Sequence, residues 1–423
     1  MRSVVQYLVR PDRRLTAAAA AVLAAACLWL VPAAIAKDRP AGRHWVATWA
    51  ISPQRANLPL VIDGQTLRQV VHVSLGGETV RVRVSNAYGS TPLVIGAAHL
   101  ALSAGSGSIA GGSDRVVTFG GSPTITIPAG ALAVSDPIAL VVADLDDVAV
   151  SLYFPDDVVA TTQHETALHT TYLSLPGNFT AAATIAGSTT ESYYFLTGIE
   201  VLAAKRARAI VALGDSFTDG YRSTVDTNQN YPSLLAARLQ AGPSTSQIAV
   251  LNQGVGGNRL LHDFVGTSGA ARFDRDVLAQ SGAGYVIVLQ GNVDLLIPGL
   301  IGNPAEVVTV AQLIQGHRQI IARAHAMGLK AFGGTLNPVE GYPFPGFWTP
   351  DLEAKRQAFN QWIRTSGAYD ALIDFDQVLR DPAQPSRLLP AYDSGDHAHP
   401  NDDGYRAMAD AIDLSLFRDS SGD

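Results

Sequence analysis

The stretch AIVALGDSFTDG, residues 209–220, determines the fold class that we expect. It opens with five apolar residues, the length of a buried β-strand, and runs directly into a polar segment bounded by two glycines. Open α/β sheets bind their ligands at the carboxyl ends of parallel strands, and Gly214 and Gly220 permit the tight turn that would expose Ser216 there. In isolation, the same residues could form an ordinary strand-to-helix turn with Ser216 as the helix cap.

Four further apolar runs of strand length follow this stretch, at residues 248–252, 285–289, 329–332 and 371–375. Before the run at 329–332, apolar residues recur with helical spacing from Val307 to Ala324, and Gly328 can end that helix. Strands that alternate with helices form a parallel sheet covered on both faces. The sequence therefore predicts a three-layer, flavodoxin-like α/β domain with a parallel sheet over residues 206–423.

The chain before this domain has a different pattern, because apolar and polar residues alternate with a period of two between about 44 and 201. The run VRVRV at 80–84 is an example, and such alternation indicates half-buried strands. Clusters of turn residues separate these runs at the spacing of an antiparallel sandwich. We therefore expect an antiparallel β-sandwich domain over residues 37–205, with the junction near 202–208.

The first 36 residues differ again from the rest of the chain. Four arginines precede an apolar stretch at 15–31, and small residues lie just before Lys37. This is the pattern of a signal peptide over residues 1–36, so we expect an exported protein, either secreted or periplasmic. An uncleaved membrane anchor is the alternative, although the stretch is short for a bilayer span. The arginine pair at 13–14 leaves twin-arginine export as a further alternative, and Cys27 leaves lipoprotein processing as another.

The composition indicates a globular protein, with 47% hydrophobic and 16% charged residues. Without the four arginines and one aspartate of the signal segment, 26 basic and 36 acidic residues give a formal net charge of −10. This acidic balance argues against nucleic acid and anionic membranes as partners, and we expect no membrane span after signal cleavage. Cys27 is the only cysteine, so the mature chain can have neither disulfides nor thiolate metal sites.

A second segment with catalytic residue types lies near the C-terminus, where residues 396–399 read DHAH. The three-residue spacing lets the Asp396 carboxylate meet the His399 imidazole across one turn and fix its tautomer. Apolar residues at 405, 408, 412 and 416 predict a closing helix that would hold this turn. Alone, Asp396 could simply cap the turn and His399 could be a surface histidine. Together with Ser216, however, they lie where a triad drawn from distant segments would take its members.

Residues 214–220 and 396–399 resemble the first and last sequence blocks of the GDSL, or SGNH, family of esterases and lipases. The likeness spans about residues 206–418, and the strand-rich half is similar to an extra N-terminal domain of some bacterial secreted members. The resemblance implies a serine carboxylic ester hydrolase that forms an acyl-enzyme. Its catalytic residues would be Ser216, Asp396 and His399, without a metal or organic cofactor.

The same resemblance implies an oxyanion hole made by the amides of Ser216 and Gly257 and by an asparagine side chain. Gly257 belongs to a second block, NQGVGGNR at 252–259, whose glycine spacing differs from that of a dinucleotide-binding loop.

The third block departs from the family order of glycine, any residue, asparagine and aspartate, because residues 291–294 read GNVD. Val293 cannot donate a hydrogen bond. Either Asn292 reaches the oxyanion through an altered turn, or this donor is missing.

The sequence leaves the ester substrate open, since a small molecule and a polysaccharide both fit. Polysaccharide deacetylation is compatible with an exported enzyme beside a β-sandwich, and hydrolysis of lipid or small acyl esters fits as well. An alternative from another class is a carbohydrate- or surface-binding protein with a degenerate, inactive hydrolase domain. The altered third block is the one feature that favours this alternative.

Other candidate residues have simpler interpretations. His317 lies on the apolar face of its predicted helix and is expected to be a packed core histidine. His164 and His169 lie in the strand-rich half without metal-ligand spacing, and His397 neighbours the proposed base. The aromatic residues at 342, 344, 347 and 348 could line an acyl or sugar pocket or pack on their own domain.

Overall fold

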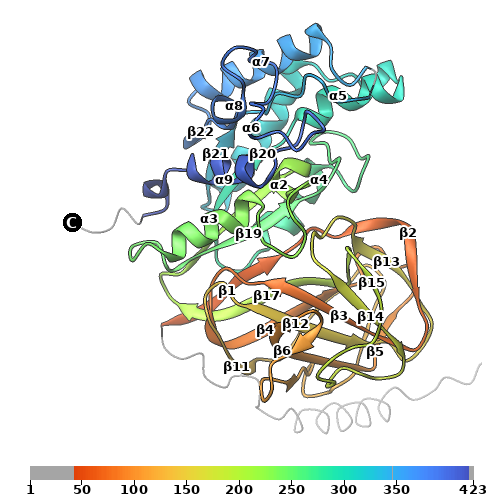
Figure 1. Ribbon diagram of the computed structural model, residues 1–423. Coiled ribbons are helices and arrows are strands. Elements are labelled where there is room, and N and C mark those ends of the chain that lie inside the picture. Colours follow the sequence, from red (N-terminus) through yellow and green to blue (C-terminus); the bar gives the residue numbers. More distant parts are fainter. Residues whose placement is uncertain (1–41, 345, 419–423) are drawn as a thin grey trace, which may run out of the picture. The chain divides into compact units, whose positions relative to one another are not determined.

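The computed structural model describes residues 42–344 and 346–418. From Arg43 onward they form one compact unit, in which a strand-rich part precedes an α/β part (Figure 1). The predicted signal peptide lies outside the described residues. Within those residues, no helix is both long enough and apolar enough to cross a bilayer.

The strand-rich part consists of antiparallel sheets, as the alternating pattern predicts. One sheet has the strand order β1-β17-β4-β10 with β11 paired to β4, and a second has the order β15-β14-β3-β12-β6-β7 with β8 paired to β6. Smaller sheets are formed by β16-β13-β2 and by β5-β9. The strands are β1 (Arg43–Ala50), β2 (Gln54–Ile62), β3 (Gln65–His72), β4 (Gly77–Ser85), β5 (Leu93–Ile95), β6 (Ala97–Gly105), β7 (Ser108–Ile109), β8 (Arg115–Val116), β9 (Ile125–Ile127), β10 (Leu132–Val134), β11 (Ile138–Val142), β12 (Asp147–Tyr153), β13 (Val158–His164), β14 (Thr171–Pro176), β15 (Gly187–Thr190), β16 (Tyr193–Tyr194) and β17 (Leu196–Ala204).

The α/β part contains a parallel five-stranded sheet with the order β19-β18-β20-β21-β22. Its strands are β18 (Arg208–Gly214), β19 (Ile248–Gly254), β20 (Ala283–Leu289), β21 (Lys330–Gly334) and β22 (Ala371–Ile373). All five predicted strands are present, although the last is shorter than expected because Phe375 already begins a helix. β18 lies between β19 and β20, so the carboxyl ends of these three strands meet at a topological switch point, where α/β sheets place their sites.

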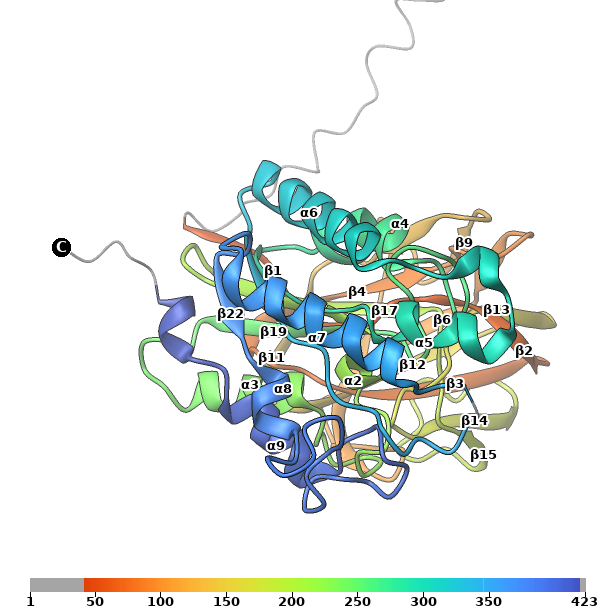
Figure 2. The same cartoon turned by 90° about the horizontal axis from the view of Figure 1, so that it is seen from above.

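Helices connect these strands. They are α2 (Ser216–Asp219), α3 (Tyr231–Gln240), α4 (Gly269–Phe273), α5 (Asn292–Ile301), α6 (Val310–Ala326), α7 (Pro350–Thr365), α8 (Phe375–Leu379) and α9 (Asp402–Asp410), with short turns of other helix types at Asp274–Leu278, Pro304–Glu306 and Leu414–Phe417. In one group of helices, α3 packs against β19 and α9. In another group, α6 packs against β21, α4 and α7. Figure 2 shows α6 and α9 on opposite sides of β19 and β22.

Two helix boundaries differ from those expected. A capping box of Thr309 and Gln312 begins α6, so Val307 lies before the helix and is exposed. The closing helix α9 ends at Asp410, which places Ile412 and Leu416 beyond it. Ile412 is buried all the same, because the chain after the helix continues to pack on the core.

Buried polar contacts join the two parts. β1 contacts β19, and the Ala47 amide donates to the Ser281 carbonyl over 2.8 Å. Deeper in the interface, the Ser52 hydroxyl lies 2.5 Å from Gln253 Oε1 and 2.9 Å from Asp276 Oδ2. The strand-rich part is therefore packed directly against β19 and the segments that follow it.

Candidate active site

The turn after β18 presents Ser216 at the start of a short helix. Asp215 is the N-cap of α2, since its side chain accepts a hydrogen bond from the Phe217 amide (3.1 Å), and Gly220 ends the helix with a φ of 102°. A Cβ at Gly214 would lie 2.0 Å from Thr218 Oγ1 and 2.6 Å from the Leu289 carbonyl oxygen, so only glycine fits there. The expected tight turn is confirmed. The alternative with Ser216 as the cap is wrong, because Asp215 takes that position.

A chain of hydrogen bonds links three of the predicted site residues. Ser216 Oγ lies 2.8 Å from His399 Nε2, and His399 Nδ1 lies 2.8 Å from Asp396 Oδ2. Because an ionised carboxylate only accepts, the imidazole carries its proton on Nδ1, and Nε2 is free to accept from the serine hydroxyl. All three residues are buried, with exposed fractions of 7 to 8%. The structure thus brings together residues from both ends of the α/β part.

The Asp396 carboxylate is held by several donors. Its Oδ1 accepts from the amides of Ala398 (3.0 Å) and His399 (2.8 Å), and Arg222 Nε lies 3.3 Å from Oδ2. Burial raises the pKa of Asp396, but the hydrogen bonds and the charge of His399 outweigh burial and lower the pKa well below its usual range. The carboxylate therefore stays ionised and can stabilise an imidazolium at His399.

Aromatic rings fix the plane of the imidazole. The Phe217 ring stacks on His399 with centroids 5.0 Å apart, and the Tyr221 ring meets it edge-on at 4.9 Å. Tyr342 approaches at 6.0 Å. These contacts leave the His399 ring little freedom to turn away from Ser216.

Two backbone amides at the cavity that Ser216 lines are available as donors. Among the described residues, neither the Ser216 N–H nor the Gly257 N–H has a hydrogen-bond partner, and both residues line one cavity. Gly257 has a φ of 70°, a conformation that favours glycine. Burial raises the pKa of the neighbouring Asp215 to about 8, so this carboxyl is neutral near pH 7.

Asn292 begins α5 and lies at the same cavity, next to Val293. Its side-chain nitrogen donates to the Asn337 carbonyl over 3.3 Å, which uses one of the two amide hydrogens. Asp294 accepts from the Leu260 amide (2.6 Å) and so ties the third block to the residues that follow Gly257. The role predicted for Asn292 as an oxyanion donor stays a prediction.

The cavity in front of Ser216 has a volume of about 310 Å³ and a mainly apolar lining. One wall comes from α5 and the other from the aromatic loop. The residues of these walls are Val293, Leu296, Ile297, Tyr342, Phe344 and Phe347. Of the four aromatic residues considered from the sequence, three line this cavity, whereas Trp348 borders a different and smaller one.

Glu165 and Thr166 also line the cavity, although they belong to the loop after β13 in the strand-rich part. Nothing in their local sequence indicates such a place, because they reach the site only through the packing of the two parts. Leu296 and Ile297 had a weak signal, since they belong to an apolar run directly after the third block.

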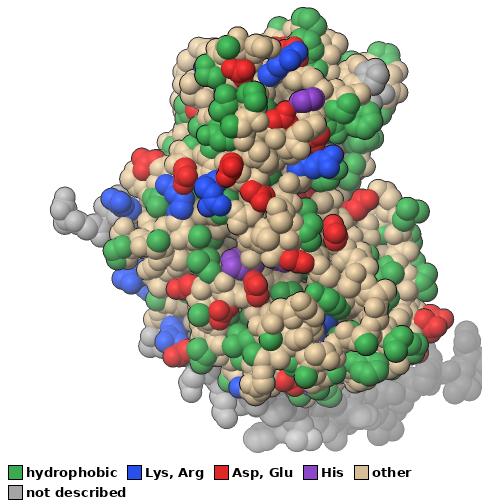
Figure 3. Space-filling model, in the orientation of Figure 1, with side chains coloured by type: hydrophobic (Ala, Val, Ile, Leu, Met, Phe, Trp, Pro, Cys, Tyr) green, Lys and Arg blue, Asp and Glu red, His purple; other side chains and the backbone are tan. Residues whose placement is uncertain are grey.

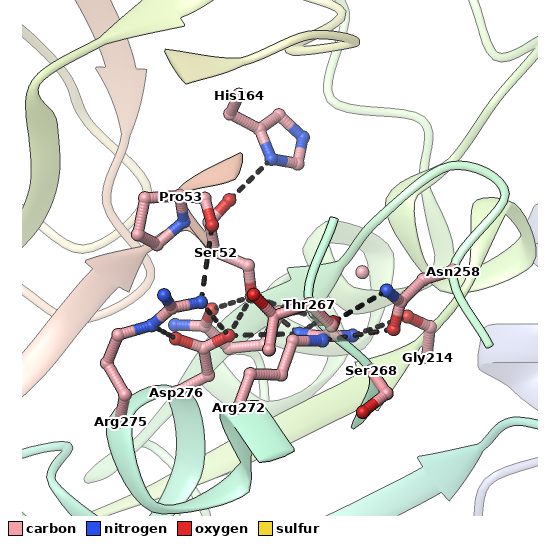
Figure 4. A network of polar contacts seen from close by, with 12 residues as sticks. Ser52, Pro53, His164, Gly214, Asn258, Thr267, Ser268, Arg272, Arg275 and Asp276 are labelled. Atoms are coloured by element: carbon pink, nitrogen blue, oxygen red, sulfur yellow. Dashed lines mark hydrogen bonds and ion pairs between the residues drawn. The ribbon is translucent and has the colours of Figure 1, made fainter. Parts of the chain in front are cut away.

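A buried arginine fixes the turns that carry Ser216 and Gly257. Arg272 donates to the Gly214 carbonyl (2.9 Å), to Asn258 Oδ1 (3.1 Å) and to Ser52 Oγ (2.6 Å) (Figure 4). Burial lowers the pKa of Arg272, and the nearby Asp276 carboxylate opposes this shift. Asp276 accepts from Arg272 over 3.2 Å, so the buried charge is paired.

The remaining histidines lie elsewhere. His317 is fully buried, with Nδ1 2.5 Å from the Tyr369 hydroxyl and Nε2 3.0 Å from the Gln290 carbonyl, which confirms a core histidine. His397 is half exposed, pairs with Asp393 and borders a separate polar cavity. Across the described ranges, no group of three or more His, Cys, Asp or Glu residues could hold a metal ion.

The surface drawn in Figure 3 shows acidic and basic side chains interspersed over both parts. No large patch of one sign is visible on this face.

Comparison with known proteins locates one family in the α/β part. Residues 212–407 match the model of the GDSL-like lipase/acylhydrolase family. A search of curated proteins found no match.

Several solved structures resemble about half of the chain. A GDSL-like lipase from Bacteroides thetaiotaomicron has 17% identity and a TM-score of 0.37, with 51% of this chain and 90% of that one covered. The acetyl xylan esterase AlAXEase has 20% identity and a TM-score of 0.37, with coverages of 48% and 96%. A variant of the acetyl xylan esterase Axe2 from Geobacillus stearothermophilus has 19% identity and a TM-score of 0.38, with coverages of 49% and 94%.

Proposed function

We propose that the chain, which matches the model of the GDSL-like lipase/acylhydrolase family over residues 212–407, is a serine ester hydrolase with Ser216 as its nucleophile. The observation that supports this proposal is the pair of 2.8 Å contacts from Ser216 through His399 to Asp396. A nucleophile, a base and a residue that orients the base, each within hydrogen-bond reach of the next, are what acyl transfer requires.

The reaction begins with attack of Ser216 Oγ on the ester carbonyl carbon. His399 Nε2 takes the hydroxyl proton, and the imidazolium that forms is stabilised by the ionised Asp396. The tetrahedral intermediate collapses when His399 returns this proton to the leaving alcohol, which leaves an acyl group on Ser216. Water then attacks the acyl-enzyme with His399 again as the base, and the acid is released.

The negative oxygen of the intermediate requires donors that are already in place. The unpartnered amides of Ser216 and Gly257 supply two, and we assign a third to the side chain of Asn292. The second hydrogen of the Asn292 amide has no partner in the part of the chain that the structure describes, so it is free for this task.

For the substrate, we infer an acyl group longer than acetyl. A cavity of about 310 Å³ with walls of aliphatic and aromatic side chains gains more from a longer apolar chain than from a methyl group. Lipid esters and other medium-chain acyl esters therefore fit this site better than acetylated polysaccharide.

A panel of aryl esters from acetate to decanoate, together with acetylated xylan, tests this specificity. We expect kcat/KM to rise from acetate to a medium chain length. A maximum at acetate, with release of acetate from xylan, would instead favour polysaccharide deacetylation.

For the fold, we propose that the helices of the α/β part form two layers on opposite faces of the parallel sheet.

We also propose that the enzyme acts outside the cytoplasm after removal of residues 1–36. This proposal is supported by the arginine-rich start and the apolar stretch that follows. Expression in a bacterial host with N-terminal sequencing of the mature protein tests it, with Lys37 expected as the first residue. A full-length protein in the cytosolic fraction would contradict it.

A further inference from the structure

His164 connects the strand-rich part to the turn that carries the nucleophile. It is the last residue of β13 and is buried, with an exposed fraction of 1%. Its Nδ1 lies 2.9 Å from the Ser52 carbonyl oxygen and its Nε2 lies 3.0 Å from Asp219 Oδ1 (Figure 4 shows the Ser52 contact). Both ring nitrogens thus face acceptors, an arrangement that favours the doubly protonated imidazolium.

The charge balance agrees with this geometry. Burial lowers the pKa of His164, but the charge and hydrogen bond of Asp219 outweigh burial, and the pKa is raised overall. His164 and Asp219 therefore form a buried ion pair across the boundary between the two parts.

Asp219 also contacts the loop that contains Gly256 and Gly257, the second of which is the proposed oxyanion donor. The residue ends α2, the helix that Ser216 begins, and its Oδ2 accepts from the Gly256 amide over 3.0 Å. Gly256 directly precedes Gly257, which lines the cavity and whose amide has no partner among the described residues. One carboxylate thus holds the helix of the nucleophile, the imidazole from the strand-rich part and the loop that carries the second oxyanion donor.

We propose that His164 is a positioning residue for the hydrolase: it fixes Asp219, and Asp219 holds the Gly256–Gly257 loop so that the Gly257 amide reaches the oxyanion. This inference rests on the proposed function of Ser216 and Gly257. It makes the strand-rich part a working component of the catalytic site, and Glu165 and Thr166, the next two residues after His164, line the cavity itself.

The expected effect is on the transition state. An oxyanion donor acts at 2.7 to 3.1 Å, and a misplacement of about 1 Å costs about 10²-fold in rate. Loss of the His164 contact should relax the loop without removing the donor. We therefore expect His164→Ala to lower kcat by about 10- to 100-fold with little change in KM.

Two conservative variants separate positioning from simple packing. In His164→Gln the amide nitrogen can take the place of Nε2 and still donate to Asp219, whereas in His164→Asn it can take the place of Nδ1 and donate only to Ser52. If the path runs through Asp219, the Gln variant should keep kcat within about fivefold of the wild type, and the Asn variant should resemble His164→Ala.

His169→Ala is a matched control. His169 lies in the same loop after β13 and also reaches the α/β part, where its Nε2 lies 2.7 Å from Asn228 Oδ1, but its contacts do not lead to Gly256. This variant also loses a histidine hydrogen bond between the strand-rich part and the α/β part, yet its kcat should stay at the wild-type level.

The experiment measures kcat and KM on a soluble aryl ester, with active sites counted by titration with a fluorophosphonate so that unfolded protein does not enter the rates. The affinity for an alkyl boronate, which forms a tetrahedral adduct on serine, should fall in parallel with kcat. Equal kcat in the Gln and Asn variants, or a kcat of His164→Ala that matches His169→Ala, would overturn the proposal. An inactive wild-type enzyme would instead refute the proposed function.

Discussion

Ser216 Oγ lies 2.8 Å from His399 Nε2, although the two residues are 183 positions apart in the chain. The contact forms because β18 lies inside the parallel sheet, and the segment before α9 returns to the carboxyl end of that strand. The sheet topology, and not local sequence, therefore assembles the nucleophile with its base.

Replacement of Ser216 or His399 by alanine should abolish nearly all ester hydrolysis. The two groups act as one unit, so either change should cost about as much as both together, about 10⁶-fold in kcat. Steady-state hydrolysis of an aryl ester measures the loss, and a fluorophosphonate should label Ser216 alone. His397→Asn is the control, because His397 borders a separate cavity. An active Ser216→Ala protein would refute the assignment.

Asp396→Asn should reduce kcat by about 10⁴-fold, less than the loss of Ser216 or His399. The amide cannot stabilise the imidazolium as the ionised carboxylate does, and it can hold His399 in the wrong tautomer. KM should change little, since Asp396 does not touch the substrate. The same substrate and active-site titration measure the effect, and a variant with more than about a tenth of the wild-type kcat would contradict a triad role.

His317 should make the enzyme less stable in acid. Burial lowers the pKa of His317 to about 4 from an ordinary value of 6.5, so the folded protein binds fewer protons than the unfolded chain within this window. The contribution of the neutral His317 to the free energy of unfolding is therefore complete above pH 6.5, and it is lost as the pH falls toward 4. Its full size is on the order of 3 kcal/mol.

His317→Gln isolates this contribution, because glutamine does not titrate. Urea unfolding of both proteins at several pH values should show the stability advantage of the wild type shrinking on acidification. A difference in unfolding free energy that is independent of pH would show that His317 does not titrate as expected.

Much of this site could be predicted from the sequence, because the relevant signals are local. The apolar run before Gly214 predicts β18, and the turn geometry follows from glycines at positions where a Cβ would collide. The three-residue spacing of Asp396 and His399 likewise predicts their contact, since both lie in one turn.

What could not be predicted depends on packing between distant segments. Thr166 lines the cavity, and His164 meets Asp219 across 55 residues, only because the strand-rich part packs on the α/β part. Apolar spacing also predicts a start of α6 near Val307, whereas the capping box at Thr309 sets the observed boundary.

The last prediction concerns Asn292, where this chain departs from the residue order of the family whose model matches residues 212–407. If the second hydrogen of its amide serves the oxyanion, Asn292→Ala should lower kcat by about 10² to 10³-fold with little change in KM. If its bond to the Asn337 carbonyl instead fixes the side chain away from the substrate, that variant should be nearly silent. The double exchange Asn292→Val with Val293→Asn should then raise kcat, because it returns an amide to the usual position at the cavity. Steady-state kinetics of the three proteins, normalised to titrated active sites, distinguish the two arrangements. An effect of Asn292→Ala below about fivefold in a folded, active enzyme would decide against Asn292 as a donor.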